Sequence, residues 1–134
     1  KGLTDRTILE RARAAGLPIS EVEAENPRLL HGKVAALITE KELGITDPEV
    51  LSAIRKHTFG SEDMSLLEKI VYLADHLEPG RMYPGVAKAR ALAFKDLDRA
   101  IVTTAEATLA FLKSKDAAID PQTTRTRDWY KNKL

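Results

Sequence analysis

The segment 64–81 constrains the fold of this chain more than any other part of the sequence. Its Ser65-x-x-Glu68 pattern is a capping box, which marks the start of an α-helix, and an apolar run follows it directly. A Glu-Pro-Gly-Arg turn then ends the run. The segment therefore predicts a helix over 66–77, which would be about 18 Å long at the standard helical rise.

Helix signals of the same kind recur along the 134 residues, whereas strand signals are nearly absent. The chain has no Asn-Gly or Asp-Gly hairpin turn and no sustained alternation of apolar and polar residues. Capping residues, proline and glycine divide it into predicted helices at 5–15, 18–26, 31–43, 48–57, 66–77, 86–94, 97–113 and 121–130. We therefore predict an all-α bundle that forms a single domain over residues 1–134.

The composition limits the partners and ligands of this chain. Its net charge of +1 gives no reason to expect DNA, RNA or a membrane as a partner. Without cysteine, a metal site has to use nitrogen and oxygen ligands. The sequence contains no signal peptide and no apolar run near 18 residues, so we expect a cytoplasmic protein.

Two histidines and one aspartate are the candidate metal ligands, each on its own predicted helix. His31 lies in a first helical turn, where the helix dipole disfavours a protonated ring and a neutral, metal-bound ring fits better. His57 lies near a helix C-terminus, where a cationic histidine is also comfortable. Asp75 interrupts an apolar run, so it either belongs to a solvated stripe or forms the floor of a polar cleft. These residues alone leave both alternatives open.

Other chemistries find no support in the sequence. His76 projects about 100° away from its neighbour Asp75 on the same helix, so we expect it to be a surface residue. The zinc-protease motif, the P-loop, the Rossmann fingerprint and the G-x-S-x-G elbow are all absent.

Several motifs together resemble the YqeK family of bacterial HD-domain hydrolases. They are Leu29-Leu-His31-Gly, Ala53-Ile-Arg-Lys-His57-Thr-x-Gly60, Met64-Ser-x-Leu-x-Lys69-Ile-x-Tyr-Leu-Ala-Asp75-x-x-Glu78-Pro-x-Arg81 and Tyr83-x-Gly85-Val. Further matches at 91–98 and 119–123 extend the likeness to nearly the whole chain. The resemblance implies an HD-domain-type helical bundle that cleaves diadenosine tetraphosphate symmetrically into two ADP.

The resemblance also implies a divalent metal, commonly binuclear and often iron, with manganese or cobalt as alternatives. Of the ligands found in that family, three map onto His31, His57 and Asp75. The others, an early histidine and a His-Asp pair, have no counterpart here. We therefore expect an N-terminally truncated bundle that binds metal weakly and is catalytically impaired as it stands.

Cationic and small residues around these positions are the candidate substrate contacts. Arg81 and Lys69 are expected to bind phosphate, although either could be a solvated surface charge. Thr58 and Gly60 are expected to line the same cleft. The expected partner is a dinucleoside polyphosphate or another nucleotide, and a homodimer is compatible with these expectations. A catalytically inactive helical module that binds nucleotide or protein is the alternative reading of the chain.

Overall fold

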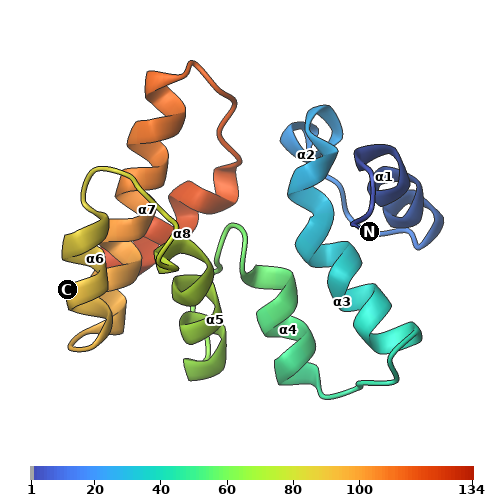
Figure 1. Ribbon diagram of the computed structural model, residues 1–134, viewed down its shortest axis with the longest axis horizontal. Helices are drawn as coiled ribbons and strands as arrows, with labels where there is room; N and C mark the ends of the chain where they lie inside the picture. Colours follow the sequence, from blue (N-terminus) through green and yellow to red (C-terminus); the bar gives the residue numbers. More distant parts are fainter. Residues whose placement is uncertain (1) are drawn as a thin grey trace.

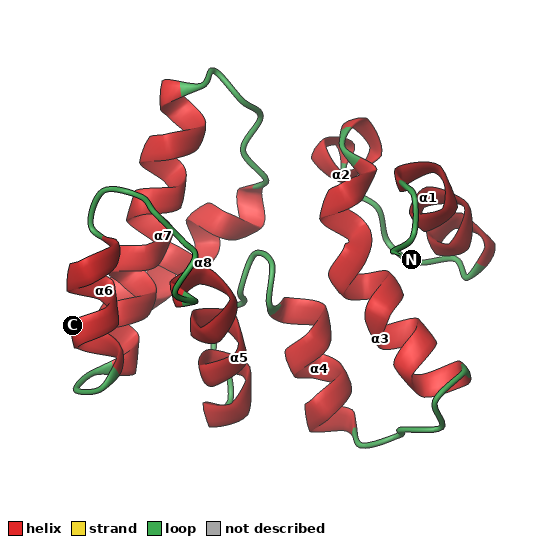
Figure 2. Cartoon of the chain, viewed as in Figure 1, coloured by secondary structure: helices red, strands yellow, loops and turns green. Residues whose placement is uncertain are grey.

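The computed structural model describes residues 2–134, and in that range it contains helices and loops but no strand (Figures 1 and 2). The elements are α1 (Asp5–Ala14), α2 (Glu21–Glu25), the 3₁₀ helix η1 (Pro27–Leu30), α3 (His31–Lys41), α4 (Pro48–Lys56), α5 (Leu66–Leu77), α6 (Val86–Ala93), α7 (Leu97–Ser114) and α8 (Pro121–Lys131). This confirms the predicted all-α architecture.

Most helices begin where a capping side chain can accept a backbone N–H, as the sequence predicts. Thr4 caps α1, Asp47 caps α4 and Asp96 caps α7. Ser65 and Glu68 form the predicted capping box at the start of α5. Local side-chain chemistry therefore sets the positions of these helix starts.

The segment 18–30 differs from the prediction. A second capping box, formed by Ser20 and Glu23, starts α2 at Glu21 rather than at residue 18. After Asn26, the chain does not enter a plain loop but forms η1, which continues directly into α3. Proline at the first position of η1 supplies a helical φ without needing a backbone donor there.

The first half of the chain packs around a small apolar cluster. Ile8 and Ala12 of α1 are buried against Leu30, at the end of η1, and Val34 of α3. From there α3 and α4 lie side by side, joined by the exposed loop 42–47 (Figure 1). This helix pair carries both candidate histidines.

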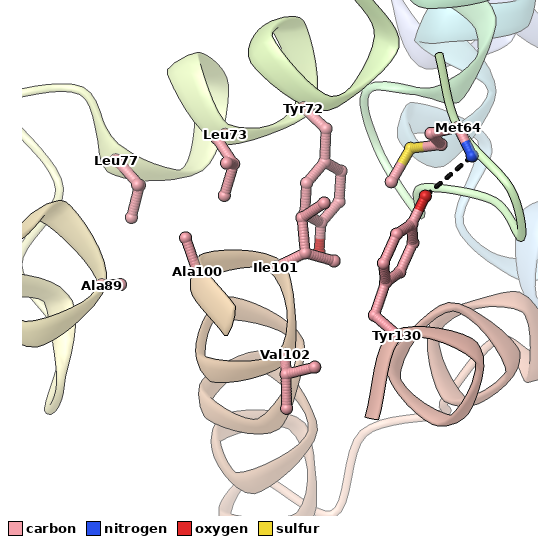
Figure 3. Close-up of a cluster of buried hydrophobic side chains, with 9 residues drawn as sticks. All are labelled: Met64, Tyr72, Leu73, Leu77, Ala89, Ala100, Ile101, Val102 and Tyr130. Atoms are coloured by element: carbon pink, nitrogen blue, oxygen red, sulfur yellow. Dashed lines mark hydrogen bonds between the residues drawn. The ribbon is translucent and has the colours of Figure 1, made fainter. Parts of the chain in front are cut away.

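The second half packs around a larger cluster formed by α5 to α8. Tyr72 and Leu73 of α5 face Ile101 of α7, and Tyr130 of α8 closes the cluster (Figure 3). The Tyr130 hydroxyl accepts a hydrogen bond of 2.7 Å from the backbone N–H of Met64, just before α5. Burial raises the pKa of Tyr130 to about 12.

The two halves meet along the contact between α4 and α5. A second contact between the halves joins the starts of α2 and α8, where the Ser20 hydroxyl donates to the Asp120 carboxylate over 2.7 Å. Within residues 2–134, no helix has the length and apolarity needed to cross a bilayer.

Candidate metal and phosphate site

The imidazole rings of His31 and His57 face each other across the α3–α4 pair. His31 is the first residue of α3 and His57 is the C-cap of α4. Their Nε2 atoms lie 2.7 Å apart, and the ring planes are inclined at 70°. The two residues are distant in sequence, so the helix packing alone brings them together.

The hydrogen bonds of the other ring nitrogens determine what this pair can bind. His31 Nδ1 lies 2.7 Å from the Arg28 carbonyl oxygen, and His57 Nδ1 lies 2.6 Å from the Ile54 carbonyl oxygen. A carbonyl oxygen can only accept, so each Nδ1 carries the proton. In the neutral rings both Nε2 atoms then present lone pairs to the same point, which is favourable only when a proton or a metal ion lies there.

Gly32 allows the two helices to approach closely enough for this arrangement. A Cβ atom at this position would lie 3.1 Å from the Ile54 carbonyl oxygen and 3.2 Å from His57 Cε1. These distances are tighter than ordinary van der Waals contacts, and two of the neighbouring atoms are backbone oxygens that cannot move aside freely. The His31-Gly32 dipeptide belongs to the family motif, but nothing in the sequence pattern indicates this packing role of Gly32.

Asp75 lies on α5, in the second half of the fold, and its side chain is 43% exposed. Its carboxylate faces Arg81, with Oδ2 3.6 Å from Nη2. Among residues 2–134, no three His, Cys, Asp or Glu side chains are arranged to hold a metal ion. The structure therefore brings together two of the three expected ligands.

The loop after α5 folds Arg81 back over the end of that helix. Arg81 Nε donates to the Asp75 carbonyl oxygen over 3.2 Å, and its guanidinium lies 3.7 Å from the Glu78 carboxylate. The side chain remains half exposed. An exposed guanidinium beside the candidate ligand Asp75 can bind phosphate oxygens in a bidentate manner.

The other three predicted substrate contacts have different surroundings. Lys69 is bound to Asp98 of α7 over 2.6 Å and lies over the ring of Tyr130, so the structure gives it a partner within the fold. Thr58 follows His57, and its hydroxyl is buried without a hydrogen-bond partner among residues 2–134. A contact with substrate would require this hydroxyl to become accessible.

Gly60 is buried in a left-handed conformation, with φ of +69°. A Cβ atom at this position would lie 2.7 Å from Thr126 Cγ2, so glycine is required for packing against α8. Gly60 also lines a cavity of about 580 Å³, together with Lys33 and Arg55. Its predicted contact with substrate would therefore have to come from its backbone.

Glu68 connects the helix that carries His57 to the helix that carries Asp75. Beyond its capping-box bond to Ser65, its carboxylate accepts from Lys56 Nζ over 2.8 Å and from the Ser52 hydroxyl, both on α4. Burial raises the pKa of Glu68, but the hydrogen bonds from Lys56, Ser52 and Ser65 outweigh it, so its pKa lies below the usual range. The capping box was predicted, whereas the bonds to α4 were not.

His76 is partly buried, and the expectation of a surface residue was wrong. Its ring packs on Tyr72 with centroids 4.3 Å apart, and its Nδ1 lies 2.8 Å from the Tyr72 carbonyl oxygen. Burial lowers the pKa of His76 and favours the neutral ring. The hundred-degree separation from Asp75 holds, but the face on which His76 lies packs against the protein.

Known proteins resemble this chain over most of its length. Residues 4–80 match the HD domain family. The symmetrical bis(5'-nucleosyl)-tetraphosphatase of Bacillus subtilis is 42% identical over 104 residues, which cover 78% of this chain and 56% of that protein. The symmetrical bis(5'-nucleosyl)-tetraphosphatase of Halalkalibacterium halodurans is 48% identical over 98 residues, which cover 73% of this chain and 52% of that protein.

A solved structure is also similar. It is a crystal structure from Clostridium acetobutylicum, described as a predicted HD superfamily hydrolase involved in NAD metabolism. It superposes with a TM-score of 0.92 at 35% identity, covering 98% of this chain and 70% of that chain. This chain spans about half the length of the curated relatives that it matches.

Proposed function

This chain belongs to the HD domain family, and from that premise we propose that it is part of a metal-dependent hydrolase that cleaves diadenosine tetraphosphate symmetrically into two ADP. The observation that carries the proposal is the convergence of His31 Nε2 and His57 Nε2 at 2.7 Å, with each Nδ1 bound to a backbone carbonyl. Relatives with 42% and 48% identity are symmetrical tetraphosphatases, which supports the choice of substrate.

Three residues of this chain would hold the metal ion. His31 and His57 hold a divalent metal through Nε2, and the carbonyls of Arg28 and Ile54 keep both rings in the ligating tautomer. Asp75 is the third proposed ligand. We propose iron as the metal, with manganese or cobalt as alternatives. Once bound, the metal supplies a nucleophilic water at neutral pH and neutralises charge on the phosphate oxygens.

Arg81 is the proposed phosphate anchor. Its guanidinium is half exposed and lies beside Asp75, so it can hold the polyphosphate chain next to the metal ligands. Thr58 is the second proposed contact because it directly follows His57, and its buried hydroxyl would have to turn outward to donate to a phosphate oxygen. Both groups orient the substrate and take no part in bond breaking.

The remaining expectations belong to the same proposal. The proposed partner is a dinucleoside polyphosphate or another nucleotide, and a net charge of +1 gives no reason to propose a nucleic acid or a membrane instead. We propose that the chain forms a single domain, that the protein is cytoplasmic and that it forms a homodimer. Limited proteolysis tests the first of these expectations, cell fractionation the second and sedimentation velocity the third.

The experiment measures ADP release from diadenosine tetraphosphate with added Fe²⁺, Mn²⁺ or Co²⁺. It uses this chain and a version extended at its N-terminus to the length of the curated relatives. We expect the extended protein to release ADP without ATP or AMP, and we expect His57→Ala to lower kcat/KM by more than about 100-fold. The exposed pair Lys131–Glu106 provides the control, because Glu106→Gln should leave activity unchanged.

Two results would contradict the proposal. One is the absence of ADP release from the extended protein with each metal. The other is activity that persists in His57→Ala at the wild-type level, with the bound metal measured in parallel by mass spectrometry.

A further inference from the structure

The loop 78–85, which joins α5 to α6, is fixed by one side chain of α6. Arg90 Nε donates to the Leu77 carbonyl oxygen over 2.9 Å. Its Nη2 donates to the carbonyl oxygens of Glu78 and Arg81, over 2.7 and 2.9 Å. A single guanidinium thus binds the last turn of α5 and the loop that leaves it.

These bonds satisfy groups that α5 cannot satisfy itself. The last carbonyl groups of a helix have no intrahelical donor. The C-cap Glu78 has an extended conformation, with ψ of 153°, so the chain leaves the helix without a glycine cap at that position. A cation at this end also interacts favourably with the helix dipole. Arg90 therefore serves as a C-cap from a neighbouring helix.

The position of Arg81 depends on this cap. Its carbonyl oxygen is bound by Arg90, and its N–H donates to the Glu78 carbonyl over 2.9 Å, closing a turn between two groups that Arg90 holds. From this fixed backbone the Arg81 side chain reaches the Asp75 carbonyl oxygen. We propose that Arg90 is a positioning residue, which holds Arg81 beside Asp75 so that Arg81 can bind the polyphosphate of the substrate.

This inference rests on the proposed function, because Arg81 is the phosphate anchor there. A purely structural role for Arg90 would predict a different coupling between the two residues. A positioning residue acts through Arg81, so its replacement should no longer affect binding once the Arg81 side chain has been removed. A structural residue would weaken binding independently of Arg81.

The test measures binding of diadenosine tetraphosphate by isothermal titration calorimetry in EDTA, so that neither hydrolysis nor metal contributes. It uses the N-terminally extended protein. We expect Arg81→Ala to weaken binding about 10-fold and Arg90→Lys, which keeps the charge but loses the planar fork, to weaken it about 3- to 10-fold. The double variant should bind as Arg81→Ala does. The control is Arg99→Lys, at an exposed pair with Asp96, which should bind as wild type does.

Hydrogen exchange of the backbone amides in 78–85 provides a second readout that needs no ligand. Arg90→Lys should accelerate exchange there, including at the Arg81 amide, and Arg99→Lys should not. Unchanged exchange in Arg90→Lys overturns the positioning role, and so do independent effects of Arg90 and Arg81 on binding. If exchange accelerates and the coupling in binding is as expected, but the extended protein releases no ADP from diadenosine tetraphosphate with any of the three metals, the positioning of Arg81 stands and the proposed function fails.

Discussion

Replacing Glu68 with Gln tests how the two halves of the fold are held together. Glu68 is 5% exposed, and its carboxylate accepts hydrogen bonds from Lys56, Ser52 and the Ser65 amide. Hydrogen bonds to a charged group each contribute about 1.5–3 kcal/mol. Gln keeps the shape and one acceptor oxygen, and the Lys56 side chain is 32% exposed, so water compensates part of the loss. We expect Glu68→Gln to lower the free energy of unfolding by about 2 kcal/mol at pH 7.

The pH dependence of this difference is a sharper test than its size. The pKa of Glu68 in the folded protein lies below its ordinary value of 4.5, so the folded state favours the ionised carboxylate. Its contribution to stability is therefore fully present above about pH 4.5 and is lost as the pH falls through the folded pKa. The gap between wild type and Glu68→Gln should narrow on acidification, since a protonated Glu68 resembles Gln.

Urea denaturation followed by circular dichroism, at several pH values between 7 and 3, measures both effects. Glu106→Gln serves as the control, because that residue forms an exposed pair with Lys131 and should change stability by less than roughly 0.5 kcal/mol. A gap that stays constant down to pH 3, or a Glu68→Gln variant as stable as wild type at pH 7, would refute the reasoning.

Three further predictions follow from the packing. Tyr130→Phe should lower the free energy of unfolding, measured by urea denaturation, by about 1–3 kcal/mol, because the Met64 N–H loses its buried acceptor. Unchanged stability would show that a water molecule takes the place of the lost hydroxyl as acceptor. Gly32→Ala should reduce the amount of metal bound by the extended protein, measured by mass spectrometry. The added Cβ would lie 3.1 Å from the Ile54 carbonyl oxygen and would push α3 and its histidine away from α4. Gly2→Ala is the control, because a Cβ there would have nothing within 4 Å. Burial raises the pKa of all three tyrosines, so the folded protein at pH 10 should show far less phenolate absorbance than the urea-unfolded chain, and the stability due to these neutral phenols should decline as the pH rises above 10.

The residues proposed for the site come from both halves of the fold, so contacts that hold the halves and their loops in place bear on its geometry. His31 and His57 come from the α3–α4 pair, and Asp75 and Arg81 come from α5 and its loop. Glu68 holds α4 against α5, and Arg90 holds the loop after α5. A change at either residue should therefore alter the geometry of the site without touching the substrate.

The sequence by itself determined the helices, because their starts depend on side chains only two or three residues away. Ser65 with Glu68, and Asp47 with Pro48, cap their helices by contacts within one turn, so the pattern and the structure agree. The family resemblance also selected His31, His57 and Asp75 as metal ligands. The residues taken alone had left each of them open to a plain structural role.

The tertiary structure decided which of these residues meet. The two Nε2 atoms converge because Gly32 lets α3 approach α4, a contact between residues more than twenty positions apart. Packing of α5 against its neighbours buries Glu68 and Tyr72, whereas Asp75 on the same helix stays partly exposed. Helical periodicity describes the face of a single helix, whereas burial and partners depend on the neighbours that the whole fold supplies.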